Sequence, residues 1–210
     1  MEQLSKNKNL WEKIQMNSVV CYNDIESFIY KKEFILAFNN HDFNFNENIY
    51  NDDLYVYSFE VEDYNNEDDY EEVFFQRYLE GDITEKYYKH YEEKFIEFMR
   101  TLFEISDAYT YYYMEIPLQD IEPAKFSKDV LCDINKIKLN NDKFKHIDNW
   151  NLFKQICYIA AREIDSVSFV FPNIQAVLIN SGLHGELISD KPLSNELVEK
   201  LKNIVHFSFE

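Results

Sequence analysis

Glycine is scarce in this chain: only three occur among 210 residues, where average usage is about 7%. The Gly-rich turns that hold phosphate groups in nucleotide-binding folds cannot be built from so few. Cysteine is equally sparse, and Cys21, Cys132 and Cys157 form no CxxC pair. An odd and widely spaced set argues against a disulfide framework and against a zinc site. We therefore expect no disulfide, no metal and a reducing cytoplasm.

Long hydrophobic runs and basic residues are also lacking. No segment approaches the roughly 20 apolar residues of a membrane span, and the first residues show no signal-peptide pattern. Lys and Arg number 21 against 39 Asp and Glu, which gives a formal net charge of −18. This charge repels a phosphate backbone and an anionic membrane surface. The sequence therefore predicts no direct nucleic-acid binding and no membrane binding.

Apolar residues, in contrast, are plentiful, with a hydrophobic fraction of 46% and an aromatic fraction of 17%. A chain of this composition and length folds, and it can bury a core without disulfides or metals. No internal repeat and no Pro/Gly/Ser-rich linker interrupts the sequence. We therefore expect one domain over residues 1–210, with a subdivision near Pro123 as the alternative.

Hydrophobic periodicity predicts several helices. The clearest runs from a capping-box-like start at Asp82 and Glu85 to about Ser106, because apolar residues recur there at intervals of three and four. Gly81 separates it from a shorter helix that starts at a cap on Asp68 or Asp69 and ends near residue 79. In the first 50 residues, the pattern predicts a helical stripe over 10–14, a helix capped by Asp24 and a buried strand over 34–38.

Alternating and aromatic runs predict the strands. Residues 55–62 alternate as in a half-buried strand, and 109–116 form an aromatic run that ends at Pro117. The last third reads as helix, β-meander and helix: a helix capped by Asp148, strands over 167–171, 174–180 and 184–188, a helix capped by Ser194, and an edge strand over 205–209. The fold class is therefore α+β, a single domain with helices packed on a mainly antiparallel sheet. The residues expected in the core are Phe95, Phe98, Leu102, Phe153, Ile156, Ala160, Phe169, Val177, Leu197 and Leu201.

No catalytic motif is present. The five histidines lack the i, i+4 spacing of a helical metal site, and no GxSxG or HExxH occurs. His184 is the most suggestive histidine, since Gly185 beside it would admit a ligand or another chain, and Glu163 or Asp165 could supply a carboxylate partner. We favour the plainer interpretation of a hairpin turn with glycines at positive φ. Cys157 lies on an apolar helix face, which predicts a buried side chain rather than a nucleophile.

One segment exceeds the background of an acidic protein. Residues 42–72 contain 12 carboxylates and no Lys or Arg, and tyrosines are interleaved with them. Tyrosine supplies rigid contact area with a hydrogen-bonding tip in protein interfaces. The residues predicted to bind a partner are Glu60, Glu62, Asp63, Tyr64, Glu67, Asp68, Asp69, Tyr70, Glu71 and Glu72. A solvated acidic loop with inward-packed tyrosines is the alternative, and a calcium site is disfavoured because the EF-hand pattern with its central glycine is absent.

These features predict a cytoplasmic, acidic protein-binding module without cofactors, which is not an enzyme and whose partner is a basic protein. Bacterial immunity proteins, which neutralise a toxin by covering it, are similar in physical type, and the codon-biased composition suggests a low-GC bacterium or phage. The alternatives are a DNA-mimic inhibitor of a nucleic-acid-binding protein and an enzyme with no recognisable motif.

Overall fold

The computed structural model describes residues 10–16, 18, 20, 22–29, 54–61, 74–106, 110–114, 144–164 and 167–209. Its helices and strands are interspersed along the chain, so that helices are not confined to one part of the sequence and strands to another. In chain order they are α1 (Leu10–Gln15), α2 (Tyr22–Ile29), β1 (Tyr55–Glu60), α3 (Phe74–Glu80), α4 (Glu85–Ile105), β2 (Thr110–Met114), β3 (Phe144–Ile147), α6 (Trp150–Ala161), β4 (Val167–Phe171), the 3-10 turn η5 (Pro172–Ile174), β5 (Ala176–Ser181), β6 (His184–Ser189), α7 (Asn195–Lys202) and β7 (His206–Phe209).

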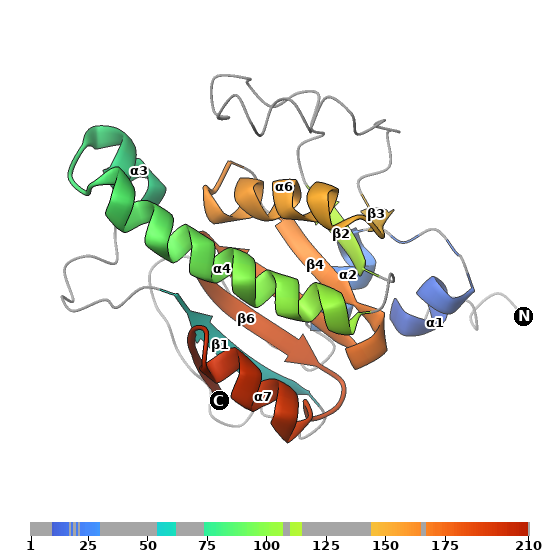
Figure 1. The fold of residues 1–210 in the computed structure, drawn as a ribbon. Helices are drawn as coiled ribbons and strands as arrows, with labels where there is room; N and C mark the ends of the chain where they lie inside the picture. The colour runs from blue at the N-terminus through green and yellow to red at the C-terminus, as the bar shows by residue number, and fades with distance from the viewer. Residues whose placement is uncertain are drawn as a thin grey trace, which may run out of the picture.

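All seven of these strands belong to one sheet in the order β3-β2-β4-β5-β6-β1-β7, and every neighbouring pair is antiparallel. Strands β4, β5 and β6 form the predicted meander, and α6 and α7 flank it in sequence. Strand β1 comes from the first third of the chain but lies between β6 and β7. Figure 1 shows it beside β6. The predicted α+β class and the C-terminal helix–meander–helix are confirmed.

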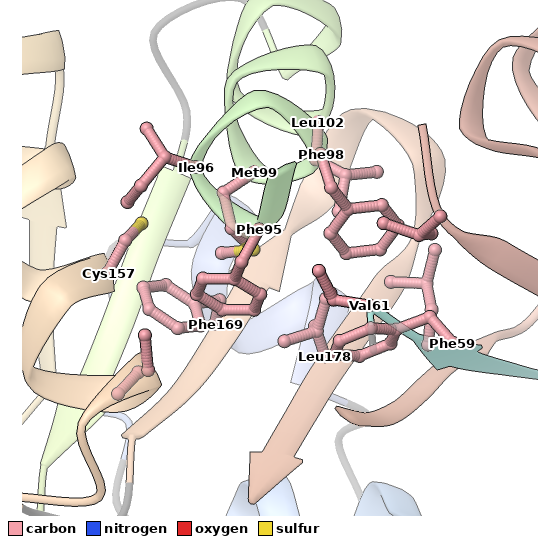
Figure 2. Packing of buried hydrophobic residues seen from close by; sticks show 14 of the residues in the cluster. Phe59, Val61, Phe95, Ile96, Phe98, Met99, Leu102, Cys157, Phe169 and Leu178 are labelled. Carbon is pink, nitrogen blue, oxygen red and sulfur yellow. The ribbon is translucent and has the colours of Figure 1, made fainter. Parts of the chain in front are cut away.

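Helices cover both faces of the sheet. Helices α4, α6 and α7 bury their apolar stripes against one face, where Phe95, Phe98 and Leu102 of α4 meet Phe59 of β1 and Phe169 of β4 (Figure 2). Helices α1 and α2 pack on the opposite face. A second cluster forms there, which contains Trp11, Ile25, Phe28, Val56, Val170, Val177 and Ile188. All ten residues predicted in the core are buried, at 4% exposure or less.

Two predicted helix caps are wrong by one or two residues. Helix α4 is capped by Thr84, whose hydroxyl accepts a hydrogen bond from the backbone N–H of Tyr87 at 3.2 Å. Asp82 is not the cap, because its own N–H closes the preceding turn onto the Arg77 carbonyl at 2.9 Å. Helix α6 is likewise capped by Asn149 rather than Asp148. Asn149 has the extended backbone that a cap requires, and its side chain accepts from the first helical N–H groups.

Other element boundaries also shift. Helix α2 begins at Tyr22, so Asp24 lies in its first turn, where it pairs with Lys13 of α1. Strand β5 begins at Ala176 rather than residue 174, since the 3-10 turn occupies 172–174. Ser194 caps α7 as predicted. The predicted strand over 34–38, the cap at 68 or 69 and the subdivision near 123 lie outside the described residues.

Candidate functional site

Strands β6, β1 and β7 bring polar side chains together at one end of the sheet. Glu60 lies directly opposite His184 of β6 on one side and His206 of β7 on the other. Two residues back along β1, Ser58 lies between Glu186 and Ser208 in the same way. Because residues two apart on a strand share a face, these side chains lie on one face of the sheet. The six residues are Ser58, Glu60, His184, Glu186, His206 and Ser208, and we call them the polar patch.

The polar patch continues the face that α1 and α2 cover. Two residues beyond Ser58 and Glu186 on the same face, Val56 of β1 lies opposite Ile188 of β6, and both are buried in the cluster with Trp11. In the patch itself, His184 and His206 are exposed and Glu60 is half-exposed. An open hollow of about 340 Å³ lies over these residues. Among the described residues, this face of the sheet is thus apolar and covered at one end, and polar and open at the other.

A tight hairpin positions His184. Gly182 has a φ of +61°, and no positive φ occurs at Leu183, which is the pattern of a two-residue type II′ turn. Gly185 permits a close approach, because a Cβ there would lie 2.1 Å from the carbonyl oxygen of Ile179. The backbone N–H of Val61 donates to the Leu183 carbonyl at 3.0 Å, which ties the end of β1 to this hairpin. The predicted hairpin around His184 is confirmed.

The electrostatics of the polar patch are dominated by carboxylates. Neighbouring side chains partly desolvate the otherwise exposed imidazole of His184 and lower its pKa, and the charge of Glu60 opposes this shift only in part. Strands β1, β6 and β7 contain Glu60 and Glu186 but no Lys or Arg. These three strands therefore carry two carboxylates and no permanent positive charge.

Of the predicted partner-binding residues, Glu60 is the one that the structure describes, and it belongs to the polar patch. The others lie outside the described residues: Glu62, Asp63, Tyr64, Glu67, Asp68, Asp69, Tyr70, Glu71 and Glu72. The structure also describes Tyr57 of β1, one of the interleaved tyrosines. Tyr57 is buried, its hydroxyl accepts a hydrogen bond from the Leu193 N–H at 3.0 Å, and its ring stacks on Phe207. Tyr57 is therefore a core residue and not part of a contact surface.

The described elements before and after residues 62–73 are part of the packed fold. Strand β1 precedes these residues, and α3 follows them. In α3 the ring of Phe75 contacts those of Tyr78 and Tyr88. The guanidinium of Arg162 lies 5.6 Å from the Phe75 ring centroid, and this Arg is itself paired with Glu92 of α4. Helix α3 and strand β1 thus both contact the hydrophobic core.

Sequence reasoning missed most of the polar patch. It singled out His184 but proposed Glu163 or Asp165 as its carboxylate partner. Asp165 lies outside the described residues, and the carboxylate that acts on His184 is Glu60. His206 drew no attention at all. The signal that could have found the patch was the alternation in each of the three predicted strands, once their order in the sheet was known.

Cys157 fits its prediction as a small apolar residue. It is fully buried in α6, and burial raises the pKa of its thiol well above the ordinary value. A buried, protonated thiol is a poor nucleophile.

Among the described residues, no group of three or more His, Cys, Asp or Glu is arranged to hold a metal ion. None of the described helices has the length and apolar character needed to cross a membrane. No protein-family model, curated protein or solved structure matches the chain significantly. What the polar patch offers is an open surface of carboxylates, imidazoles and hydroxyls, which accept hydrogen bonds from cationic groups.

Proposed function

We propose that this protein is an acidic binding module whose partner is a basic protein. More specifically, we propose that it is a cytoplasmic immunity protein, which neutralises a cognate basic bacterial toxin by direct binding. The observation that carries the proposal is the distribution of charge. Residues 42–72 hold 12 carboxylates and no Lys or Arg. Glu60, within that segment, lies in the open polar patch between two histidines.

The rest of the described surface is electrically more balanced. On α4, Lys89 pairs with Glu85 and Arg100 with Glu104, each one turn apart. On α7, Lys200 pairs with Glu196 and Lys202 with Glu199. A concentration of acid in one stretch of the sequence, in contrast to these charge-balanced helices, favours a defined docking region. Mimicry of a nucleic-acid backbone would instead require acid spread along an extended surface.

Such a concentration has a kinetic advantage for an inhibitor. Carboxylates at this density attract a cationic partner and speed encounter, and the attraction is screened beyond the Debye length of about 8 Å at physiological ionic strength. A toxin must be bound quickly, before it acts inside the producing cell. Electrostatic steering provides that speed without requiring a catalytic site.

The test uses a partner recovered by co-purification from the source organism, followed by an assay of that partner's activity. In one variant, Glu62, Asp63, Glu67, Asp68 and Asp69 are replaced with Gln or Asn. In a matched control, five exposed carboxylates of α4 and α7 are replaced with Gln: Glu93, Glu97, Glu104, Glu196 and Glu199. Both variants change the net charge equally.

Stopped-flow association should slow about tenfold or more in the acidic-segment variant and much less in the control, with a weaker effect on dissociation. The wild-type rate should also fall steeply with salt. Equal effects of the two variants, or rates that respond to neither salt nor substitution, would contradict a docking role for the segment. A bound partner whose activity is not inhibited would reject the immunity function while leaving the binding function intact.

A further inference from the structure

We propose that the partner docks by adding an extended, basic segment as a strand along the outer edge of β7, with its cationic side chains over the polar patch. This inference rests on the proposed function, in that the partner is taken to be a basic protein. It goes further by assigning the binding mode, the site and the sequence pattern of the bound segment.

The first support is the edge itself. In the described part of the chain, β7 is the last strand of the sheet and pairs with β1 on one side. An edge strand presents a row of N–H and C=O groups to which another strand can add. Native edges are commonly protected by Lys, Pro or a bulge. Strand β7 reads His206–Phe209, HFSF, without Lys or Pro, and it pairs in continuous register with β1.

The second support is the character of the two faces at this edge. His206 and Ser208 belong to the polar patch, and Phe207 and Phe209 point to the opposite face. Phe207 is buried against Tyr57, whereas Phe209 is 60% exposed. Side chains of an added strand would alternate between the same two faces. The fitting segment therefore alternates basic residues, over the polar patch, with apolar residues, beside Phe209.

Charge selects the partner over a second copy of this chain. Two copies paired edge to edge would bring together molecules of net charge −18 and place the carboxylates of both polar patches close to each other. A basic segment instead brings charge opposite to that of the polar patch, which contains two carboxylates, Glu60 and Glu186. Lys200 and Lys202 belong to α7, which packs on the opposite face of the sheet, and they pair with Glu196 and Glu199 within that helix.

The test uses the full chain and two fluorescent peptides of about ten residues, a usual strand length. One peptide alternates Lys and Val, and the other has the same composition with all Lys in one block. The protein variant is Ser208→Lys, which adds a cation to the β7 edge in an open part of the sheet. The control is Asn151→Lys, the same charge change at an exposed position of α6, which packs over β3, β4 and β5.

We expect the alternating peptide to bind about tenfold more tightly than the block peptide, and Ser208→Lys to weaken its binding about tenfold, with Asn151→Lys within about twofold of wild type. Hydrogen–deuterium exchange should show that amides of residues 206–209 become slower to exchange when the alternating peptide binds. Protection at these amides separates strand addition from non-specific charge attraction.

Several outcomes would overturn the inference. Equal binding of the two peptides without protection in β7 would mean charge attraction alone. In that case the proposed function would still hold if the acidic-segment variant associated with the recovered partner more slowly than wild type. If the variant associated at the wild-type rate, both the strand-addition inference and the proposed function would be rejected. Full protection in the free protein, at all concentrations, of the β7 amides that do not bond to β1 would show that this chain covers its own edge. Protection that grows with protein concentration and disappears in Ser208→Lys would show a homodimer.

Discussion

Arg162, in the turn after α6, donates two hydrogen bonds to the carboxylate of Glu92 in α4, from Nε to Oε1 at 2.7 Å and from Nη2 to Oε2 at 3.1 Å. The two side chains are 12% and 6% exposed. The Tyr88 hydroxyl donates to the same carboxylate, and burial raises the pKa of this phenol far above its ordinary value. The Phe75 ring lies over the guanidinium. One buried ion pair thus joins α3, α4 and α6.

Breaking this pair from one side should be costly. Arg162→Met leaves the Glu92 carboxylate buried without its cation, and we expect the free energy of unfolding to fall by about 3–5 kcal/mol in urea titrations. Arg100→Met, in the exposed pair with Glu104, should cost less than about 1 kcal/mol. The double variant Glu92→Met with Arg162→Met should recover much of the loss. Similar losses for Arg162→Met and Arg100→Met would show that the buried pair is no stronger than a surface one.

Replacing Gly81 and Gly185 with Ala should lower the free energy of unfolding by very different amounts. A Cβ on Gly185 would lie 2.1 Å from the Ile179 carbonyl oxygen and 2.7 Å from the Asn180 Cα, and these backbone atoms cannot rotate away. Gly185→Ala should therefore destabilise the fold by about 3 kcal/mol or more. Gly81 has a φ of +86° with no atom within 4 Å of the added Cβ. Gly81→Ala should cost only about 1 kcal/mol for its backbone conformation. Thermal melting of both variants would check the order, and equal costs would contradict the close approach at Gly185.

Stability should depend on the protonation of His184. Partial desolvation lowers its pKa below the ordinary value of 6.5, so the unfolded chain takes up this proton at a higher pH than the folded chain does. The unfolded state then binds more protons in that window, and the free energy of unfolding should decrease as the pH falls from about 7 to about 5. In His184→Gln this part of the pH dependence should be absent. Urea titrations at several pH values would measure it, and identical slopes for wild type and variant would rule out the contribution.

Neutralising the acidic segment should not weaken the fold. Replacing Glu62, Asp63, Glu67, Asp68 and Asp69 with Gln or Asn relieves like-charge repulsion, which opposes compactness in a chain of net charge −18. We expect the melting temperature at low salt to stay the same or rise. The difference from wild type should shrink at high salt because screening removes the repulsion in both. A marked fall in melting temperature would show that these carboxylates make stabilising contacts.

Residues whose environment depends on local periodicity were predicted well from the sequence. Phe95 and Leu102 lie on a stripe that any amphipathic helix must bury, and Phe169 and Val177 lie in short apolar runs between turns. The helix caps were less certain, since Asp148 and Asn149 are both good capping residues and the choice depends on a single pair of backbone angles.

The polar patch depends on long-range pairing and could not be predicted in the same way. Glu60, His184 and His206 each occupy an ordinary position in a predicted strand. They become neighbours only because β1 lies between β6 and β7, and no local pattern encodes that order. The acidic segment is the reverse case: its composition is plain in the sequence, whereas of its predicted partner-binding residues the structure places Glu60 alone.

The position of β1 between two late strands also has a consequence during synthesis. This strand leaves the ribosome early, but its neighbours follow much later: β6 begins roughly 120 residues and β7 roughly 150 residues after β1 ends, a delay on the order of ten seconds at usual translation rates. Until then the ring of Tyr57 and the backbone groups of β1 have no native partners. A nascent chain of this protein therefore carries an unpaired strand for most of its translation, and the adjoining carboxylates act as gatekeepers that discourage association between neighbouring nascent chains.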